Sequence, residues 1–170
     1  SIPVEIAEAE NPVRIEEYGI VQDTGGAGKF RGALAQVRRV RCLAPEATLQ
    51  LRSDKRLHPP YGLAGGMNGS PSQNILSGGK KDLLLRTMTQ LPVRRNEMIS
   101  HYLAGGGGWG DPLERDPALV ADDVRSEKVS VKHARDAYGV VVDPQTFAVD
   151  GPATGRLRAA LAAGTRRRVK

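Results

Sequence analysis

The chain has 170 residues, which is enough for one domain with a substantial core or for one domain with a helical extension. Only 4% of the residues are aromatic, so any core must be mostly aliphatic. The formal net charge of +6 lies within residues 156–170, while the rest of the chain carries equal numbers of basic and acidic side chains, which argues against a nucleic-acid-binding face on the body.

Residues 1–103 are predicted to form short strands joined by turns. Apolar and polar residues alternate with period two at 3–9, 13–21, 33–43, 47–54, 82–91 and 97–103. The stretches between them are rich in Gly, Pro, Asn and Ser, which favour turns. We therefore expect a mainly β fold of about six or seven strands, arranged as an antiparallel sandwich or a barrel-like sheet, with a short C-terminal helical appendage.

Helix signals begin after Pro112. Asp116 is a favourable N-cap followed by Pro117, and a second helix is predicted between Ser130 and Gly139. Two short strands around residue 144 and a last helix over 153–163 are expected to follow. The predicted parts are a β-rich body over 1–110, a helical appendage over 111–143, and a small hairpin, helix and basic tail over 144–170.

The single cysteine, Cys42, excludes an internal disulfide and favours a reducing, cytoplasmic setting, with the side chain buried as a small hydrophobe. No apolar run approaches the length of a membrane span, and no secretory pattern begins the chain. The sequence opens at Ser1 within a strand-like pattern and without a methionine. We therefore expect it to be a segment of a longer polypeptide.

The sequence GGAGK at residues 25–29 resembles a phosphate-binding loop only superficially. The P-loop pattern requires a glycine where this chain has Asp23 and a Ser or Thr where it has Phe30. Nucleotide binding through this loop is therefore not expected.

A polar cluster precedes the turn at Pro59 and Pro60. It contains Arg52, Asp54, Lys55, Arg56 and His58. Such a cluster at a strand end can line a polar site, because arginine offers a two-pronged grip on carboxylates. The alternatives are a solvated strand end, or pairing between Arg52 and Asp54 on one face of the strand.

Three histidines, His58, His101 and His133, lie far apart in the sequence and lack the spacing of a metal site. No metal site is expected in this segment. His101 is the best placed for a functional role because it lies in a predicted strand just before the glycine run, and His133 is expected to face solvent.

The run GGGGWGDP at residues 105–112 ends too far before Pro117 for its amides to form a helix N-terminus that holds phosphate. We expect it to act as a hinge between body and appendage, with Trp109 packed into the body. A position near substrate is the alternative, since bare backbone leaves room for a ligand.

Four stretches, at 11–40, 51–74, 105–117 and 123–143, together resemble the C-terminal part of hydantoinase B/5-oxoprolinase proteins. This family includes N-methylhydantoinase B and is related to the large subunits of acetone carboxylases. The resemblance covers about residues 1–145. The matching motif positions are Asp23, Gly25, Gly26, Gly28, Arg31, Gly32, Arg52, Pro59, Pro60, Gly62, Gly65, Gly66, Gly105, Gly106, Gly107, Gly108, Trp109, Gly110, Asp111 and Pro112.

The resemblance implies ATP-dependent hydrolysis of a cyclic amide such as hydantoin or 5-oxoproline, through phosphorylation of the amide oxygen and attack of water. It also implies a hydantoinase A-type partner subunit, the upstream part of the B subunit, and ATP and a divalent metal bound outside this segment. We expect the segment alone to be inactive. Within it, Arg31, Arg52 and Asp111 are the candidate polar participants, which orient substrate or fix a subunit contact.

Three alternatives remain open from the sequence. The segment can be a non-catalytic module that builds a subunit interface, or part of an acetone-carboxylase-type large subunit. The third alternative is nucleic-acid binding through the basic tail, but the single cluster without interleaved aromatic residues argues against it.

Overall fold

The structure is a computed structural model that describes residues 2–79 and 81–168, with side chains described as far as residue 163. The chain divides into two compact units. The first, here the sheet unit, contains Ser1–Val21, Ala35–Pro59 and Pro71–Ala104. The second, here the glycine–helix unit, contains Gln22–Leu34, Pro60–Ser70 and Gly105–Lys170. The division of the chain into the parts 1–110, 111–143 and 144–170 remains a prediction.

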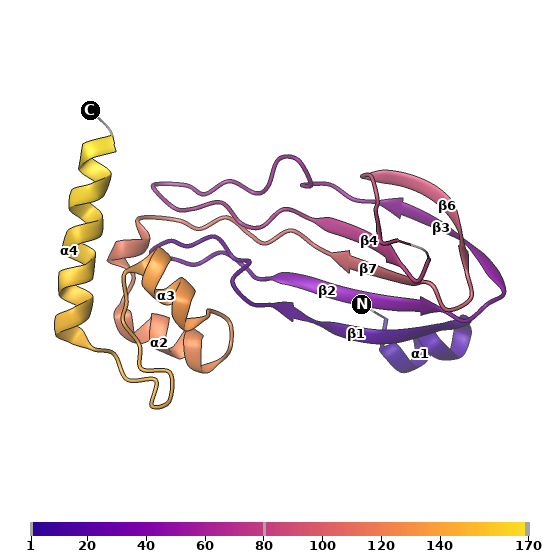
Figure 1. The fold of residues 1–170 in the computed structure, drawn as a ribbon, viewed down its shortest axis with the longest axis horizontal. Coiled ribbons are helices and arrows are strands. Elements are labelled where there is room, and N and C mark those ends of the chain that lie inside the picture. Colours follow the sequence, from indigo (N-terminus) through magenta and orange to yellow (C-terminus); the bar gives the residue numbers. More distant parts are fainter. Residues whose placement is uncertain (1, 80, 169–170) are drawn as a thin grey trace. The chain divides into compact units, whose positions relative to one another are not determined.

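The sheet unit contains one helix and the seven strands of the described chain, all paired antiparallel (Figure 1). The elements are α1 (Val4–Glu10), β1 (Val13–Val21), β2 (Ala35–Cys42), β3 (Glu46–Arg52), β4 (Gln73–Ser77), β5 (Leu83–Leu84), β6 (Met88–Arg94) and β7 (Met98–Tyr102). Five strands form a sheet in the order β1-β2-β7-β4-β5, and β3 pairs with β6. The mainly β prediction is confirmed, with open sheets and no closed barrel.

Alternation along the strands builds the core of the sheet unit. In β2, Ala35 and Val37 are buried while Gln36 and Arg38 are exposed, as expected for side chains that point to opposite faces. The buried cluster of this unit consists of Cys42, Leu51, Leu76, Leu85 and Val93. The predicted burial of Cys42 is confirmed.

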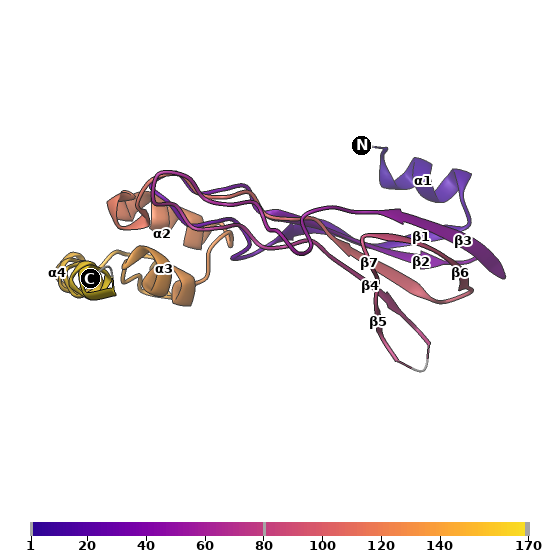
Figure 2. The same ribbon diagram turned by 90° about the horizontal axis from the view of Figure 1, so that it is seen from above.

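Two strand predictions are wrong. Residues 4–10 form helix α1, because Glu and Ala dominate the stretch and both favour helix, and Asn11 closes it by donating to the carbonyl of Ala7. Figure 2 shows α1 on one side of β1 and β2. The expected strand at 82–91 is split into β5 and β6, which belong to different sheets, and between them the amide of Leu85 donates to the carbonyl of Asn74.

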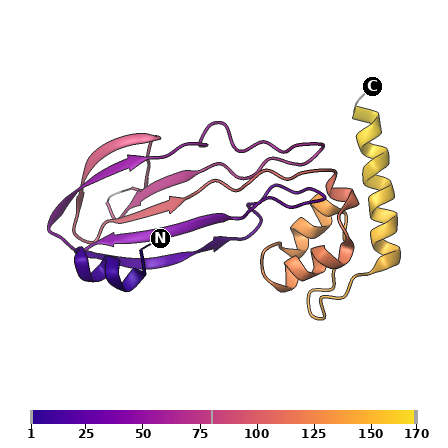
Figure 3. The same ribbon diagram turned by 180° about the vertical axis from the view of Figure 1, so that it is seen from behind.

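The glycine–helix unit contains the other helices. They are η1 (Pro112–Glu114), α2 (Pro117–Arg125), α3 (Val131–Tyr138) and α4 (Gly151–Arg168), seen together in Figure 3. The predicted caps are confirmed, since the Asp116 carboxylate accepts from the Ala118 amide and the Ser130 hydroxyl accepts from the His133 amide. A second core of buried residues includes Val120, Val124, Ala134, Tyr138 and Val140.

The expected hairpin before α4 is reduced to one antiparallel bridge between Val142 and Val149. The Asp143 carboxylate accepts hydrogen bonds from the backbone amides of Gln145 and Thr146, which makes a tight turn instead of longer strands. Helix α4 begins at Gly151 and ends at Arg168, longer at both ends than the predicted 153–163.

Candidate functional site

Three extended segments of the glycine–helix unit, at 22–34, 60–70 and 105–110, are joined by backbone hydrogen bonds. The Gly26 amide donates to the Gly106 carbonyl at 2.8 Å. The Met67 amide donates to the Ala27 carbonyl at 2.7 Å, and the Gly108 amide donates to the Met67 carbonyl at 2.9 Å. Each segment is therefore bonded to both others, and we call this arrangement the glycine bundle.

The glycine bundle requires glycine because backbone lies where a side chain would begin. A Cβ on Gly26 would lie 2.2 Å from the Met67 carbonyl oxygen, and one on Gly108 would lie 2.3 Å from the Ala27 carbonyl oxygen. Real Cβ atoms do not approach backbone so closely, so these positions exclude every other residue. The run at 105–110 is therefore a packed part of this bundle, and its role as a hinge stays a prediction.

The GGAGK loop does not fit the phosphates of ATP. The amides of Gly26 and Lys29 already donate to the carbonyls of Gly106 and Gly110. A phosphate loop needs such amides to point at the ligand. Trp109 also differs from its prediction, because its ring is half exposed and lies 5.7 Å from the ring of Phe30 instead of packing into a core.

Arg31 is held in a nearly buried ion pair of the same unit. Its Nε lies 3.1 Å from Oδ2 of Asp123, and Nη2 of Arg115 lies 2.9 Å from the same oxygen. Sequence reasoning missed Asp123 and Arg115. Asp123 lies within the matching stretch 123–143 and on the inner face of α2, next to Val124, and that position could have indicated its burial.

Asp111 has a local structural contact. Its carboxylate accepts the Leu113 amide at 2.8 Å and so caps η1. It also lines a hollow of about 610 Å³ together with Met67, Leu113 and Leu161. Arg31 and Asp111 therefore both belong to the glycine–helix unit, whereas Arg52 belongs to the sheet unit.

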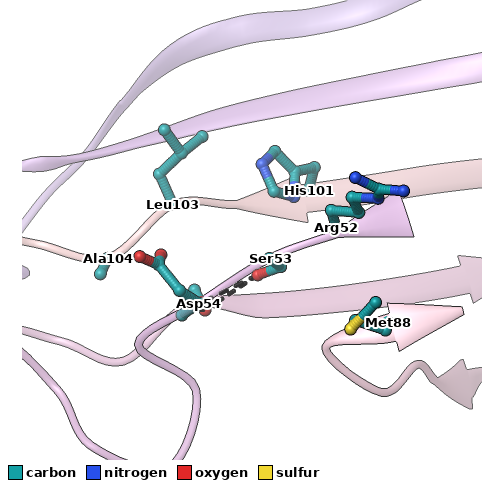
Figure 4. Close-up of a pocket in the computed structure, with 8 residues that line it drawn as sticks. Arg52, Ser53, Asp54, Met88, His101, Leu103 and Ala104 are labelled. Carbon is teal, nitrogen blue, oxygen red and sulfur yellow. Dashed lines mark hydrogen bonds between the residues drawn. The ribbon is translucent and has the colours of Figure 1, made fainter. Parts of the chain in front are cut away.

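The sheet unit contains a pocket of about 620 Å³ between the ends of β3 and β7 (Figure 4). We call it the β3–β7 pocket. Its lining residues lie at the ends of β3 and β7 and just after them, with one residue from the start of β6 and one just before β4. They are Arg52, Ser53, Asp54, Ser72, Met88, His101, Leu103 and Ala104. The volume lies within the range of ligand sites.

Arg52 and Asp54 are both exposed to this pocket, and no hydrogen bond or ion pair joins their charged groups to any described residue. The suggested pairing of Arg52 with Asp54 does not form. Between them, the hydroxyl groups of Ser53 and Ser72 lie 3.2 Å apart, and the Ser72 hydroxyl donates to the backbone carbonyl of Asp54. These serine contacts fix the backbone of the segment that carries both charges.

His101 is paired across the sheet with Asn74, which is fully buried. One imidazole nitrogen of His101 hydrogen-bonds the Asn74 side-chain oxygen, and the Asn74 amide nitrogen has no protein partner. Burial, and to a smaller extent the charge of Arg38, lowers the pKa of His101. Because the Asn74 oxygen can only accept, Nδ1 of His101 donates to it; the lowered pKa favours the neutral imidazole, whose other nitrogen then accepts hydrogen bonds.

The remaining histidines have no comparable setting. The Nε2 atom of His133 is buried without a partner, and its ring stands edge-on to Tyr138 at 5.9 Å, so the solvent-facing prediction is wrong. Within residues 2–79 and 81–168, no three His, Cys, Asp or Glu side chains form a group able to hold a metal. No helix among the described residues is long and apolar enough to cross a membrane.

The chain was compared with known protein families, proteins and solved structures. The model of the family described as hydantoinase B/oxoprolinase matches residues 1–112. An uncharacterized protein of Methanocaldococcus jannaschii is 34% identical over 158 residues, which cover 92% of this chain and 28% of that protein. The beta subunit of a caprolactamase from Pseudomonas jessenii is 34% identical over 147 residues, covering 82% of this chain and 25% of the subunit.

Solved structures agree. The crystal structure of the ATP-dependent caprolactamase from Pseudomonas jessenii is 30% identical with a TM-score of 0.79, covering 94% of this chain and 28% of that chain. Acetone carboxylase in its nucleotide-free form has a TM-score of 0.83 at 23% identity over 98% of this chain and 27% of that one, and so shares the fold. The chain spans about a quarter of the length of these relatives. Because the family model covers most of its residues, the chain belongs to the hydantoinase B/oxoprolinase family.

Proposed function

We propose that this chain is the C-terminal part of a B-type subunit in an ATP-dependent enzyme that hydrolyses a cyclic amide. The observation that carries the proposal is the likeness to an ATP-dependent caprolactamase, which extends over 94% of the chain in fold and sequence together. The proposed partners are the upstream part of the same subunit and a hydantoinase A-type subunit. The similarity to the beta subunit of a caprolactamase supports such an assembly.

ATP would supply activation of the amide oxygen by phosphorylation. For ATP, the amides of Gly26 and Lys29 in the GGAGK loop are already bonded, and for a divalent metal, no group of three His, Cys, Asp or Glu side chains is present among the described residues. We therefore assign both to other parts of the enzyme and derive no step through them here. The segment contributes binding and architecture.

The three candidate polar residues receive different roles in this proposal. Arg52 contacts the substrate or its product, and its support is an unpaired guanidinium in the β3–β7 pocket. Arg31 positions α2 through Asp123, and Asp111 positions η1 through its cap. These two residues therefore act on the architecture of the glycine–helix unit.

The experiment uses the full-length subunit with its A-type partner, assayed for ADP release and ring opening on ε-caprolactam, 5-oxoproline and hydantoin. We expect ATP-dependent hydrolysis of at least one ring. Arg52→Ala should lower kcat/KM by at least about tenfold, as expected for the loss of a charge-assisted contact. Arg95→Ala, at an exposed turn of the same unit, is the matched control and should be neutral.

The second candidate function is a subunit-interface module, and a specific observation favours it. Phe30, Leu63 and Trp109 are exposed and lie on adjacent segments of the glycine bundle, where Trp109 bridges to both others. Exposed apolar side chains that lie together mark contact surfaces. If the segment is only an interface, Trp109→Ser disrupts assembly while Arg52→Ala leaves turnover unchanged. Turnover lost in Arg52→Ala with the assembly intact supports a site role.

The acetone-carboxylase alternative is tested in the same preparation. Its support is the shared fold alone. Bicarbonate-dependent consumption of acetone with ATP, and no hydrolysis of any of the three rings, would replace the hydrolase proposal with this one.

A further inference from the structure

The β3–β7 pocket holds two opposite charges that the protein itself leaves uncompensated. The guanidinium of Arg52 and the carboxylate of Asp54 both line it, and neither is bonded to any described side chain. Arg31 and Arg39 of the described chain are, by contrast, paired with Asp123 and Glu17. The charges of Arg52 and Asp54 are thus available to a ligand.

The two charges are also separated along one face. Arg52 ends β3 and Asp54 lies two residues further, so their backbone positions are roughly 7 Å apart if the extended course continues. Figure 4 shows the Arg52 side chain and the Asp54 carboxylate pointing in different directions, with the carboxylate toward Ala104. Met88 and Leu103 supply apolar lining of the same pocket.

This lining matches a ligand with an anionic end, a cationic end and apolar groups. Arginine binds carboxylates by a bidentate hydrogen-bonded pair, and a carboxylate binds an ammonium group by a charge-assisted bond.

We propose that the β3–β7 pocket binds the ring-opened product of the reaction as an amino acid zwitterion, with its carboxylate on Arg52 and its ammonium on Asp54. This inference rests on the proposed function for the identity of the ligand. Hydrolysis of a lactam breaks the ring C–N bond, places the oxygen of water on the carbonyl carbon and leaves the nitrogen protonated as ammonium. The product therefore carries both charges that the pocket complements.

The same chemistry selects between substrate classes. Opening of a hydantoin ring leaves a ureido group, which is neutral and gives Asp54 no cation to bind. A lactam leaves an ammonium group. The pocket thus assigns the lactams, and not the hydantoins, as the substrate class of this enzyme.

The test measures binding by titration calorimetry to the full-length subunit, without ATP and without the A-type partner. The probes are 6-aminohexanoate, hexanoate, hexylamine and 6-ureidohexanoate. We expect 6-aminohexanoate to bind at least about tenfold more tightly than each of the other three, because each lacks one charged end. Equal affinity for 6-aminohexanoate and 6-ureidohexanoate would overturn the assignment of Asp54, and the absence of 6-aminohexanoate binding would overturn the proposal.

Variants then locate the binding. Arg52→Gln and Asp54→Asn should each weaken 6-aminohexanoate binding by about tenfold or more, and Arg52→Lys should retain part of the affinity. The matched controls Arg95→Gln and Glu10→Gln remove exposed charges of the same unit outside the pocket and should bind as the unchanged protein does. Circular dichroism checks that each variant is folded. Unchanged affinity in the folded Arg52 and Asp54 variants would place the ligand elsewhere and overturn the proposal.

Failure of this inference is separable from failure of the proposed function. Zwitterion binding that persists in a preparation with no ATP-dependent hydrolysis of any ring contradicts the proposed function alone. ATP-dependent lactam hydrolysis in a protein that does not bind 6-aminohexanoate contradicts the pocket assignment alone.

Discussion

At the scale of single residues, burial separates positions that hold the fold from positions free to meet a ligand. Arg31 and Arg115 share the nearly buried Asp123, and a pair of this kind is costly to break because it leaves an uncompensated charge. Arg52 has no such partner among the residues that the structure describes. Two arginines in the same family motifs therefore have different physical roles, and only their surroundings distinguish them.

Tyr138 shows the cost of a buried polar atom. Its side chain is fully buried, its hydroxyl has no hydrogen-bond partner among the described atoms, and burial raises its pKa to about 12. The folded-state pKa of Tyr138 exceeds the ordinary value of about 10. The contribution of this group to the free energy of unfolding is therefore fully present below pH 10 and is lost as the pH rises toward 12.

The first prediction concerns Tyr138→Phe. It should raise the free energy of unfolding by about 1 kcal/mol at neutral pH, because an unpaired buried hydroxyl is removed without changing the ring. The variant should also lose less stability than the unchanged protein between pH 9 and pH 11.5. Thermal unfolding followed by circular dichroism measures both effects. A variant destabilised at neutral pH would show that the hydroxyl has a partner.

At the scale of elements, the glycine bundle explains why glycines gather in three separate stretches. Backbone atoms of one segment occupy the space of a Cβ on the next, as at Gly32, where the Gly106 carbonyl oxygen would lie 2.0 Å away. Hydrogen bonds between the segments then satisfy the backbone groups that close packing removes from water. The bundle is therefore an element in its own right, built from backbone instead of side chains.

The second prediction compares two glycine substitutions. Gly108→Ala should lower the free energy of unfolding of the glycine–helix unit by at least about 3 kcal/mol, because the new methyl group meets the Ala27 carbonyl and backbone must shift. Gly155→Ala, in α4, where nothing lies within 4 Å of the new methyl group, should instead stabilise by about 0.5–1 kcal/mol. Thermal unfolding of both variants decides the matter. Equal effects would contradict close packing at Gly108.

At the scale of the whole molecule, the described chain contains two hydrophobic clusters that share no residue. Val93 is buried in the cluster of the sheet unit, and Val120 is buried in that of the glycine–helix unit. Each unit is built from three separate segments of the sequence, so neither unit corresponds to one continuous stretch.

The third prediction follows from the two clusters. Val93→Ala and Val120→Ala should each cost about 2 kcal/mol, through lost burial and the cavity left behind. In native-state hydrogen exchange, Val93→Ala should lower protection mainly in β3 and β6, and Val120→Ala mainly in α2 and α3. A uniform loss of protection in either variant would show that the two clusters unfold as one.

The sequence by itself determined the features that depend on neighbours along the chain. Alternation predicted most of the strands, Asp116 and Ser130 predicted where two helices begin, and the burial of Cys42 followed from its surroundings. The family motifs identified the family. Each of these signals is local, because strand faces and helix caps are set by residues within a few positions of one another.

The tertiary structure alone decided the features that depend on distant partners. The partner of Arg31 lies at Asp123, and the atoms that forbid a side chain at Gly26 belong to Met67 and Gly108. The β3–β7 pocket likewise joins Arg52 to His101 across two sheets. Local sequence does not specify which distant segment supplies a neighbour, because that choice is made by the packing of the whole chain.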